Sequence, residues 1–155
     1  MKPEDFILEL VVPAKVVAGK TGIPVSFTIA QAALESAWGE SKLAKAGKNL
    51  FGVKADKSWT GPVVLMPTRE FIDGKWITID AGWREYEDWQ ECLDDHSRFL
   101  MNNKRYKVAF SHTDGPGFAD EVARAGYATD PDYAKKIKQI ISAHNLEALN
   151  MPLEV

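Results

Sequence analysis

One glutamate, within an alanine-rich run, has the residue type and the setting that suit acid–base chemistry. Glu35 lies in the run 29–39, near its C-terminal end and three residues before Trp38. The neighbouring side chains are small and apolar, so they would solvate a carboxylate poorly and keep its proton bound to higher pH. A carboxyl that keeps its proton can act as a general acid. The alternative is a solvated helix glutamate, the commoner state of this residue type.

A second candidate carboxylate lies in a segment with the pattern of a β-hairpin. Glu70 precedes the dipeptide Asp73-Gly74, a tight-turn sequence between two arms that are rich in strand-forming residues. A hairpin can arch over a groove and bring this carboxylate toward Glu35. The alternative is that Glu70 protects an exposed strand edge with its charge.

The elements that must position these carboxylates are predicted to be mainly helical. Helical spacing of apolar residues predicts a first helix over about 4–19, which Pro13 kinks or divides, and a central helix that Pro24 and Ser26 begin and Gly39 ends. Asp88 and Asp130 mark the starts of two later helices. The expected fold is a mainly α single domain over 1–155, with six or seven helices and one hairpin within 59–83.

Composition and charge exclude several classes of partner. The chain has 155 residues, 45% of them hydrophobic, and a formal net charge of −3. No basic face favours nucleic acid, and no apolar run approaches the roughly 20 residues of a membrane span. Cys92 is the only cysteine and is expected in the core, and the three histidines lack metal-ligand spacing. We therefore expect a monomer without nucleic acid, metal, cofactor or stable membrane insertion.

Several short motifs occur together in the order and spacing of a known enzyme family. From about Phe6 to Leu146 the chain resembles the flagellar-rod and autolysin type of endo-β-N-acetylglucosaminidase, glycoside hydrolase family 73. The motifs are Ala32-Ala33-Leu34-Glu35-Ser36-Ala37-Trp38-Gly39, Asn49-Leu50-Phe51-Gly52-Val53-Lys54, Trp59-Thr60-Gly61, Thr68-Arg69-Glu70, Asn103-Lys104-Arg105-Tyr106 and Gly126-Tyr127-Ala128-Thr129-Asp130-Pro131-Asp132-Tyr133. The resemblance implies a lysozyme-like α-helical fold and cleavage of peptidoglycan between N-acetylglucosamine and N-acetylmuramic acid.

The resemblance also implies roles for single residues. The family's general acid falls on Glu35, its hairpin glutamate on Glu70 and its motif tyrosine on Tyr127. The positions that line the glycan fall on Asn49, Phe51 and Trp38. Arg69 departs from the family pattern, because relatives commonly carry a neutral residue beside the hairpin glutamate. An Arg69–Glu70 pair would weaken the role of Glu70 as a base.

The residues leave two catalytic routes open. Glycoside cleavage needs a proton donor and a stabiliser of the developing positive charge, and Glu35 with Glu70 could supply both. Alternatively, the acetamido oxygen of an N-acetyl sugar acts as the nucleophile, and Tyr127 orients it or the attacking water. Tyr127 could instead be a packing residue beside the last helix. Trp59 is the tryptophan expected to stack on a sugar, whereas Trp76, Trp83 and Trp89 are expected to pack.

The sequence therefore predicts a peptidoglycan hydrolase acting in bacterial cell lysis as an endo-β-N-acetylglucosaminidase. The alternatives are an N-acetylmuramidase and a non-catalytic peptidoglycan-binding module. The first residues, Met1 to Asp5, lack the charged-then-apolar order of a secretory signal. We therefore expect synthesis in the cytoplasm and release to the wall through a holin-type lesion, as for a phage endolysin, with effector secretion or flagellar export as alternatives.

Overall fold

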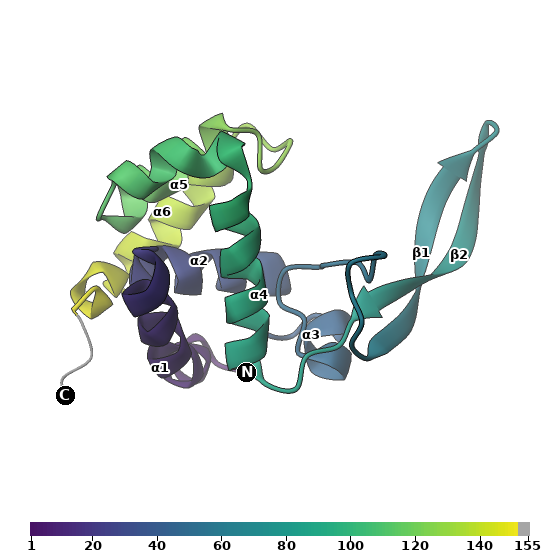
Figure 1. The fold of residues 1–155 in the computed structure, drawn as a ribbon, viewed down its shortest axis with the longest axis horizontal. Coiled ribbons are helices and arrows are strands. Elements are labelled where there is room, and N and C mark those ends of the chain that lie inside the picture. Colours follow the sequence, from purple (N-terminus) through teal and green to yellow (C-terminus); the bar gives the residue numbers. More distant parts are fainter. Residues whose placement is uncertain (152–155) are drawn as a thin grey trace.

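Helices form a body from one side of which a two-stranded hairpin projects (Figure 1). The structure is a computed structural model that describes residues 1–151. In that part of the chain the α-helices are α1 (Pro3–Thr21), α2 (Val25–Ser36), α3 (Lys42–Gly47), α4 (Trp89–Asn102), α5 (Gly115–Arg124) and α6 (Tyr133–Ala143). Two 3₁₀ helices, η1 (Lys104–Ser111) and η2 (Leu146–Leu149), and the strands β1 (Val63–Ile72) and β2 (Lys75–Arg84) complete it. The predicted mainly α fold with one inserted hairpin is confirmed.

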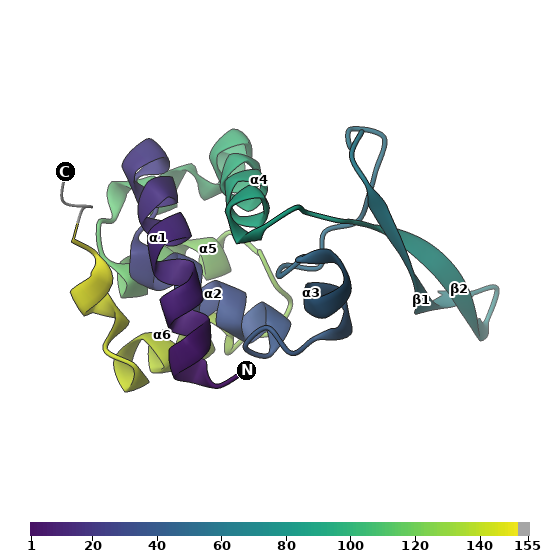
Figure 2. The same ribbon diagram turned by 90° about the horizontal axis from the view of Figure 1, so that it is seen from below.

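Helix α2 is the centre of the core, with α1, α5, α6 and η2 packed around it (Figure 2). Every residue from Val25 to Ala33 is buried. Ser26 was predicted to cap this helix, but it lies inside it, and its hydroxyl donates to Glu147 Oε2 at 3.0 Å. The helix begins instead just after Pro24, whose fixed φ suits that position.

Helix α1 runs unbroken through Pro13, so the predicted division at this proline is wrong. The residues on either side, Leu10 and Ala14, are fully buried. Their packing keeps the chain helical although the proline removes one backbone hydrogen bond. The helix ends at Gly22, whose left-handed conformation (φ 81°) turns the chain toward α2.

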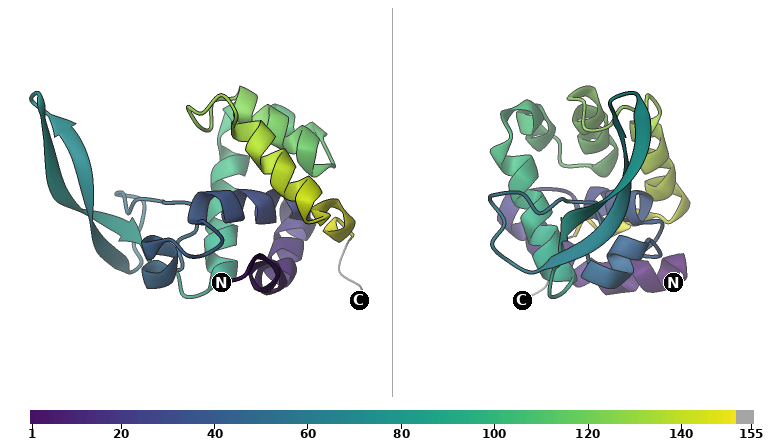
Figure 3. Two further views of the ribbon diagram at one scale, coloured as in Figure 1. Left: turned by 180° about the vertical axis from the view of Figure 1, so that it is seen from behind. Right: turned by 90° about the vertical axis from the view of Figure 1, so that its right-hand side faces the viewer.

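The hairpin has the predicted turn and an unbroken antiparallel register. Asp73 and Gly74 both have positive φ (52° and 78°), as a two-residue hairpin turn requires, and Glu70 pairs with Ile77 across the strands. Only α3 among the helices packs substantially against the strands, so the outer part of the hairpin stands clear of the helices (Figure 3). Trp76, predicted to pack, is 61% exposed there.

Helix α4 connects the hairpin to the second half of the helical body. Asp88 caps it as predicted, accepting from the backbone N–H of Glu91 at 2.9 Å. Its inner face includes Cys92, which is fully buried as predicted, and burial raises the pKa of this thiol to about 12. Within 1–151, no helix combines the length and apolarity that crossing a bilayer requires.

Candidate active site

A groove of about 1230 Å³ lies where the helical body meets the base of the hairpin. Its lining comes from the end of α2, the loop after α3, the last residue of β2, the outer face of α4 and the segments around 102–106 and 127–129. Glu35, Phe51 and Tyr127, three of the predicted site residues, are among the residues that line it. These side chains are far apart in the sequence, and the fold brings them together.

Glu35 is the next-to-last residue of α2, and its side chain is exposed in the groove. Its Oε1 accepts a hydrogen bond of 2.6 Å from the hydroxyl of Tyr133. The buried setting expected from the apolar neighbours is absent, because the Glu35 side chain is exposed and Ala37 beside it is exposed as well. No Lys, Arg or His nitrogen of residues 1–151 lies within 4 Å of this carboxylate.

Two stacked tyrosines stand beside the carboxylate. The rings of Tyr127 and Tyr133 are 5.5 Å apart at 23°. Burial, and then the negative charge of Glu35, raises the pKa of both hydroxyls, so both stay protonated at neutral pH. Tyr133 lies within a motif of the family resemblance, but no role in the site was predicted for it from the sequence. Its place in the same motif, at the start of the last helix, is the signal that could have found it.

Phe51 forms part of the groove through a stacked pair with a buried histidine. The rings of Phe51 and His96 are 3.7 Å apart and nearly parallel (10°). Full burial lowers the pKa of His96 to about 3, so its imidazole is neutral. His96 lines the groove, and its Nε2 lies 2.9 Å from the side-chain oxygen of Gln31, which is fully buried. The polar interior behind the groove was not predicted from the sequence.

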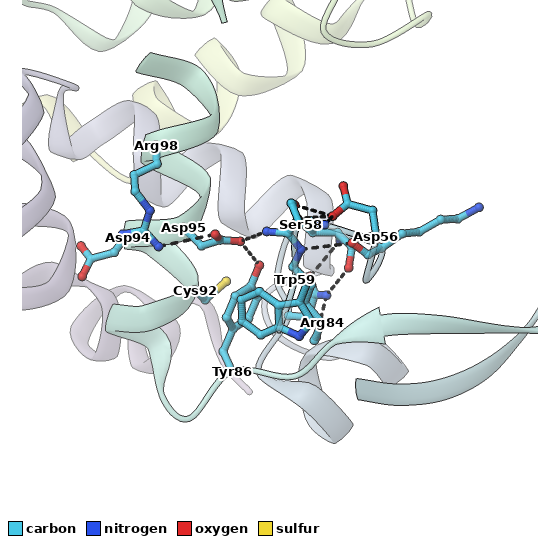
Figure 4. Close-up of polar contacts among 12 residues, drawn as sticks. Asp56, Ser58, Trp59, Arg84, Tyr86, Cys92, Asp94, Asp95 and Arg98 are labelled. Atoms are coloured by element: carbon cyan, nitrogen blue, oxygen red, sulfur yellow. Dashed lines mark hydrogen bonds and ion pairs between the residues drawn. The ribbon is translucent and has the colours of Figure 1, made fainter. Parts of the chain in front are cut away.

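Arg84, at the end of β2, ties the hairpin to the helical body at the groove wall (Figure 4). Its side chain is 13% exposed and donates to Asp95 of α4 at 2.8 Å, to the carbonyl of Lys54 at 3.1 Å and to Asp56 at 3.2 Å. The hydroxyl of Tyr86 donates to the same Asp95 oxygen at 2.6 Å. Because this one side chain is bonded both to α4 and to the loop after α3, it fixes how the hairpin leaves the helices.

Three residues predicted to contact sugar lie outside the groove lining. Trp38 packs against Phe6 and His144 on another side of α2, with ring centroids 5.7 and 4.9 Å apart. Its backbone is left-handed (φ 58°), and it is not among the residues that line the groove. Trp59 donates from Nε1 to the carbonyl of Pro62 at 2.8 Å, and its ring covers the Arg84 guanidinium at 5.1 Å.

Asn49 is buried, and its side chain holds the loop after α3 in place. Its Nδ2 donates to the carbonyls of Val53 and Arg84, both at 2.9 Å, and its Oδ1 accepts from the N–H of Val53 at 3.1 Å. These bonds use both N–H groups of the amide and give Asn49 a structural role, and its predicted contact with sugar stays a prediction.

Glu70 also lies outside the groove lining, on the outer half of the hairpin. It pairs with Lys54 Nζ at 3.6 Å rather than with Arg69, whose guanidinium lies over the ring of Trp76 at 5.2 Å. The Arg69–Glu70 pair that the sequence left open is therefore not formed. The physical reason is strand alternation, which sends these adjacent side chains to opposite faces of the hairpin.

The groove thus contains one carboxyl without a cationic partner, beside two protonated tyrosine hydroxyls. The other two groove carboxylates, Asp56 and Asp95, are both bonded to Arg84. Residues 1–151 contain no group of three or more His, Cys, Asp or Glu side chains that could hold a metal ion. An arrangement of this kind can donate a proton from Glu35 to a bound molecule and orient it by hydrogen bonds.

Comparison with known proteins relates this arrangement to enzymes. Residues 12–146 match the glucosaminidase family model, described as mannosyl-glycoprotein endo-beta-N-acetylglucosaminidase. The chain is 39% identical over 142 residues to the peptidoglycan hydrolase FlgJ of Vibrio parahaemolyticus, covering 89% of this chain and 46% of that protein. It is 40% identical over 147 residues to the exo-glucosaminidase LytG of Bacillus subtilis, covering 92% and 51%.

A solved structure agrees with these sequence matches. The fold matches a C-terminally truncated glycoside hydrolase domain of FlgJ from Salmonella typhimurium with a TM-score of 0.81 at 35% identity, covering 93% of this chain and 98% of that one. The chain spans about half the length of the curated relatives. Because the family model covers residues 12–146 and the fold matches a solved glycoside hydrolase domain, this chain belongs to the glucosaminidase family, glycoside hydrolase family 73.

Proposed function

We propose that this chain is a peptidoglycan hydrolase that cleaves glycan strands internally at N-acetylglucosamine, as one catalytic domain over 1–155. The observation that carries the proposal is Glu35, a carboxyl exposed in the groove and hydrogen-bonded to Tyr133. Family membership supports the substrate, because a relative in Vibrio is named a peptidoglycan hydrolase and another in Bacillus an exo-glucosaminidase. Such a substrate lies in the cell wall, beyond the cytoplasmic membrane, so that is the place of action.

In the proposed reaction Glu35 protonates the glycosidic oxygen while the bond from that oxygen to C1 breaks. The carbonyl oxygen of the acetamido group on the same sugar attacks C1 and forms a cyclic oxazolinium. Water then attacks C1, gives its proton to the Glu35 carboxylate and reopens the ring, so the acid is regenerated. The position of Glu70 outside the groove lining supports this route over a carboxylate base on the hairpin.

Tyr127 has a role of its own in this proposal. It lines the groove and keeps its hydroxyl proton, so it can donate to the acetamido group or hold the attacking water. Phe51 supplies an apolar part of the wall, against which the face of a sugar ring can pack.

Product analysis tests the function. Purified peptidoglycan is digested, the new reducing ends are reduced with borohydride, and the sugar alcohols are identified by mass spectrometry. Reduced N-acetylglucosamine in fragments of several disaccharides is the expected product. Reduced N-acetylmuramic acid would show an N-acetylmuramidase, release from the strand end alone would show an exo-enzyme, and retention on the wall without release would show a binding module.

A further inference from the structure

A continuous chain of hydrogen bonds leads from Glu35 into the core. Tyr133 Oη donates to Glu35 Oε1 at 2.6 Å, and Gln31 Nε2 donates to the same hydroxyl at 3.0 Å. The Gln31 oxygen in turn lies 2.9 Å from His96 Nε2. Gln31 is fully buried and does not line the groove, so it can act on a substrate only through its neighbours.

With the Gln31 amide oriented as it is in the structure, each bond in this chain has one direction. The amide oxygen of Gln31 can only accept, so the proton of the neutral His96 ring lies on Nε2. The amide nitrogen can only donate, so the Tyr133 oxygen accepts from Gln31. The single proton of that hydroxyl then points to Glu35 Oε1. Bonds that run head to tail in a dry interior polarise one another and strengthen each link.

The direction of the chain decides which oxygen of the catalytic carboxyl carries its proton. Because Oε1 accepts the proton of Tyr133, Oε2 is the oxygen of Glu35 that is left free to carry and donate a proton. We propose that Gln31 and His96 are positioning residues that, through Tyr133, reserve Oε2 of Glu35 as the proton-donating oxygen. The inference rests on the proposed function of Glu35 as the general acid.

Packing keeps the inner end of the chain in this orientation. His96 is stacked on Phe51 at 3.7 Å, and the edge of its ring faces Tyr127 with ring centroids 5.9 Å apart. A ring held on two sides cannot rotate to present its other nitrogen without displacing an aromatic neighbour. The histidine therefore fixes the orientation of the Gln31 amide, and the amide fixes the direction in which the Tyr133 hydroxyl donates.

A double-mutant cycle on soluble glycan strands tests the coupling. Gln31→Met keeps the side-chain length and removes both hydrogen bonds, so kcat should fall about threefold to tenfold while KM is unchanged. In the Tyr133→Phe background the same change should cost nothing further in kcat, because the link to Glu35 is already cut. The matched control is Thr28→Val, also buried and on the same helix one turn earlier, which should leave kcat within about twofold.

The histidine end has a rescue test. His96→Phe keeps an aromatic ring beside Phe51 but removes the donor, so kcat should fall as in Gln31→Met. His96→Gln restores an N–H near the position of Nε2 and should recover most of the kcat. Thermal unfolding followed by circular dichroism identifies the folded variants. If the Gln31 and Tyr133 variants do not fold, the two His96 variants still test the inference, and the reverse also holds.

Three outcomes would overturn the inference: losses in kcat that multiply in the double variant, losses confined to KM, or equal activity of His96→Phe and His96→Gln. Inactive unmutated protein would instead refute the proposed function. The two failures are therefore distinguishable in one set of measurements.

Discussion

Among residues 1–151, one hydrogen bond joins the Glu35 side chain to the rest of the protein, and its donor is a tyrosine 98 residues later in the sequence. A carboxyl in this state is oriented and still exposed to an incoming molecule. The environment that surrounds it during catalysis must then include the substrate itself, because in the free protein the groove is open to water. At the residue scale, Tyr133 therefore orients the Glu35 carboxyl before a substrate covers it.

Replacing Glu35 tests its role most directly. Glu35→Gln keeps the size of the side chain and its acceptor for Tyr133, but it removes the transferable proton. The rate of peptidoglycan hydrolysis should fall about 10²- to 10⁴-fold, measured as release of soluble reducing ends. The melting temperature should change little, since the residue is exposed. Turnover within a factor of two of the unmutated protein would rule Glu35 out as the acid.

His96 gives the stability of the fold a defined dependence on pH. Its pKa is lowered from 6.5 to about 3 by burial, so between these values the unfolded chain binds a proton that the native protein excludes. The free energy of unfolding is therefore at its full value above pH 6.5. It decreases as the pH falls toward 3, by up to about 1.4 kcal/mol per pH unit. Urea unfolding of the unmutated protein and His96→Gln between pH 7 and 4 measures it. Parallel stability curves would contradict the assignment.

At the scale of elements, the hairpin depends on a small number of contacts at its base. Beyond α3, its link to the helices is the Arg84 side chain, which reaches α4 and the loop after α3 at once. In the outer part of the hairpin, the side chains of Phe71 and Trp76 are 60% and 61% exposed. Its orientation is therefore set at one end by a buried ion pair and left free of helix contacts at the other.

Removing this arginine should cost much more stability than removing its neighbour. Arg84→Met leaves Asp95, 13% exposed, without its closest cation, and should destabilise the fold by roughly 2–4 kcal/mol. The matched control is Arg98→Met, which removes a 3.5 Å contact to the same carboxylate from a side chain that is 62% exposed and should cost under about 1 kcal/mol. Urea unfolding of both variants gives the comparison. Equal losses would mean that the hairpin base does not depend on Arg84.

Elements with a local signal were predictable, whereas side-chain directions in the loops were not. The turn at Asp73-Gly74 and the cap at Asp88 follow from the residues themselves, and both are confirmed. Asn49 and Trp38 do not line the groove, because distant partners decide the directions of their side chains. The amide of Asn49 bonds the carbonyl of Arg84, 35 residues later, and no property of the segment 47–54 indicates that partner.

At the scale of the whole molecule, the site joins the two ends of the chain. Tyr133 and Gln31 are bonded across 102 residues, and the N–H and hydroxyl of Ser26 bond Asn150 and Glu147, more than 120 residues away. The family resemblance predicted the groove residues Glu35, Phe51 and Tyr127 because it compares the whole chain at once. The hydrogen-bond chain behind them needed coordinates, since periodicity indicates burial and not partners.

Because Cys92 is buried, the unmodified chain can be labelled at introduced cysteines without labelling its own. The thiolate is the form that reacts with maleimides, and a pKa of about 12 leaves almost none of it at neutral pH. Cysteines introduced at Asp73 in the hairpin turn and at Lys135 on the exposed surface of α6 would therefore carry a dye pair without removal of the native cysteine. The distance between hairpin and helices can then be followed in solution, with and without glycan.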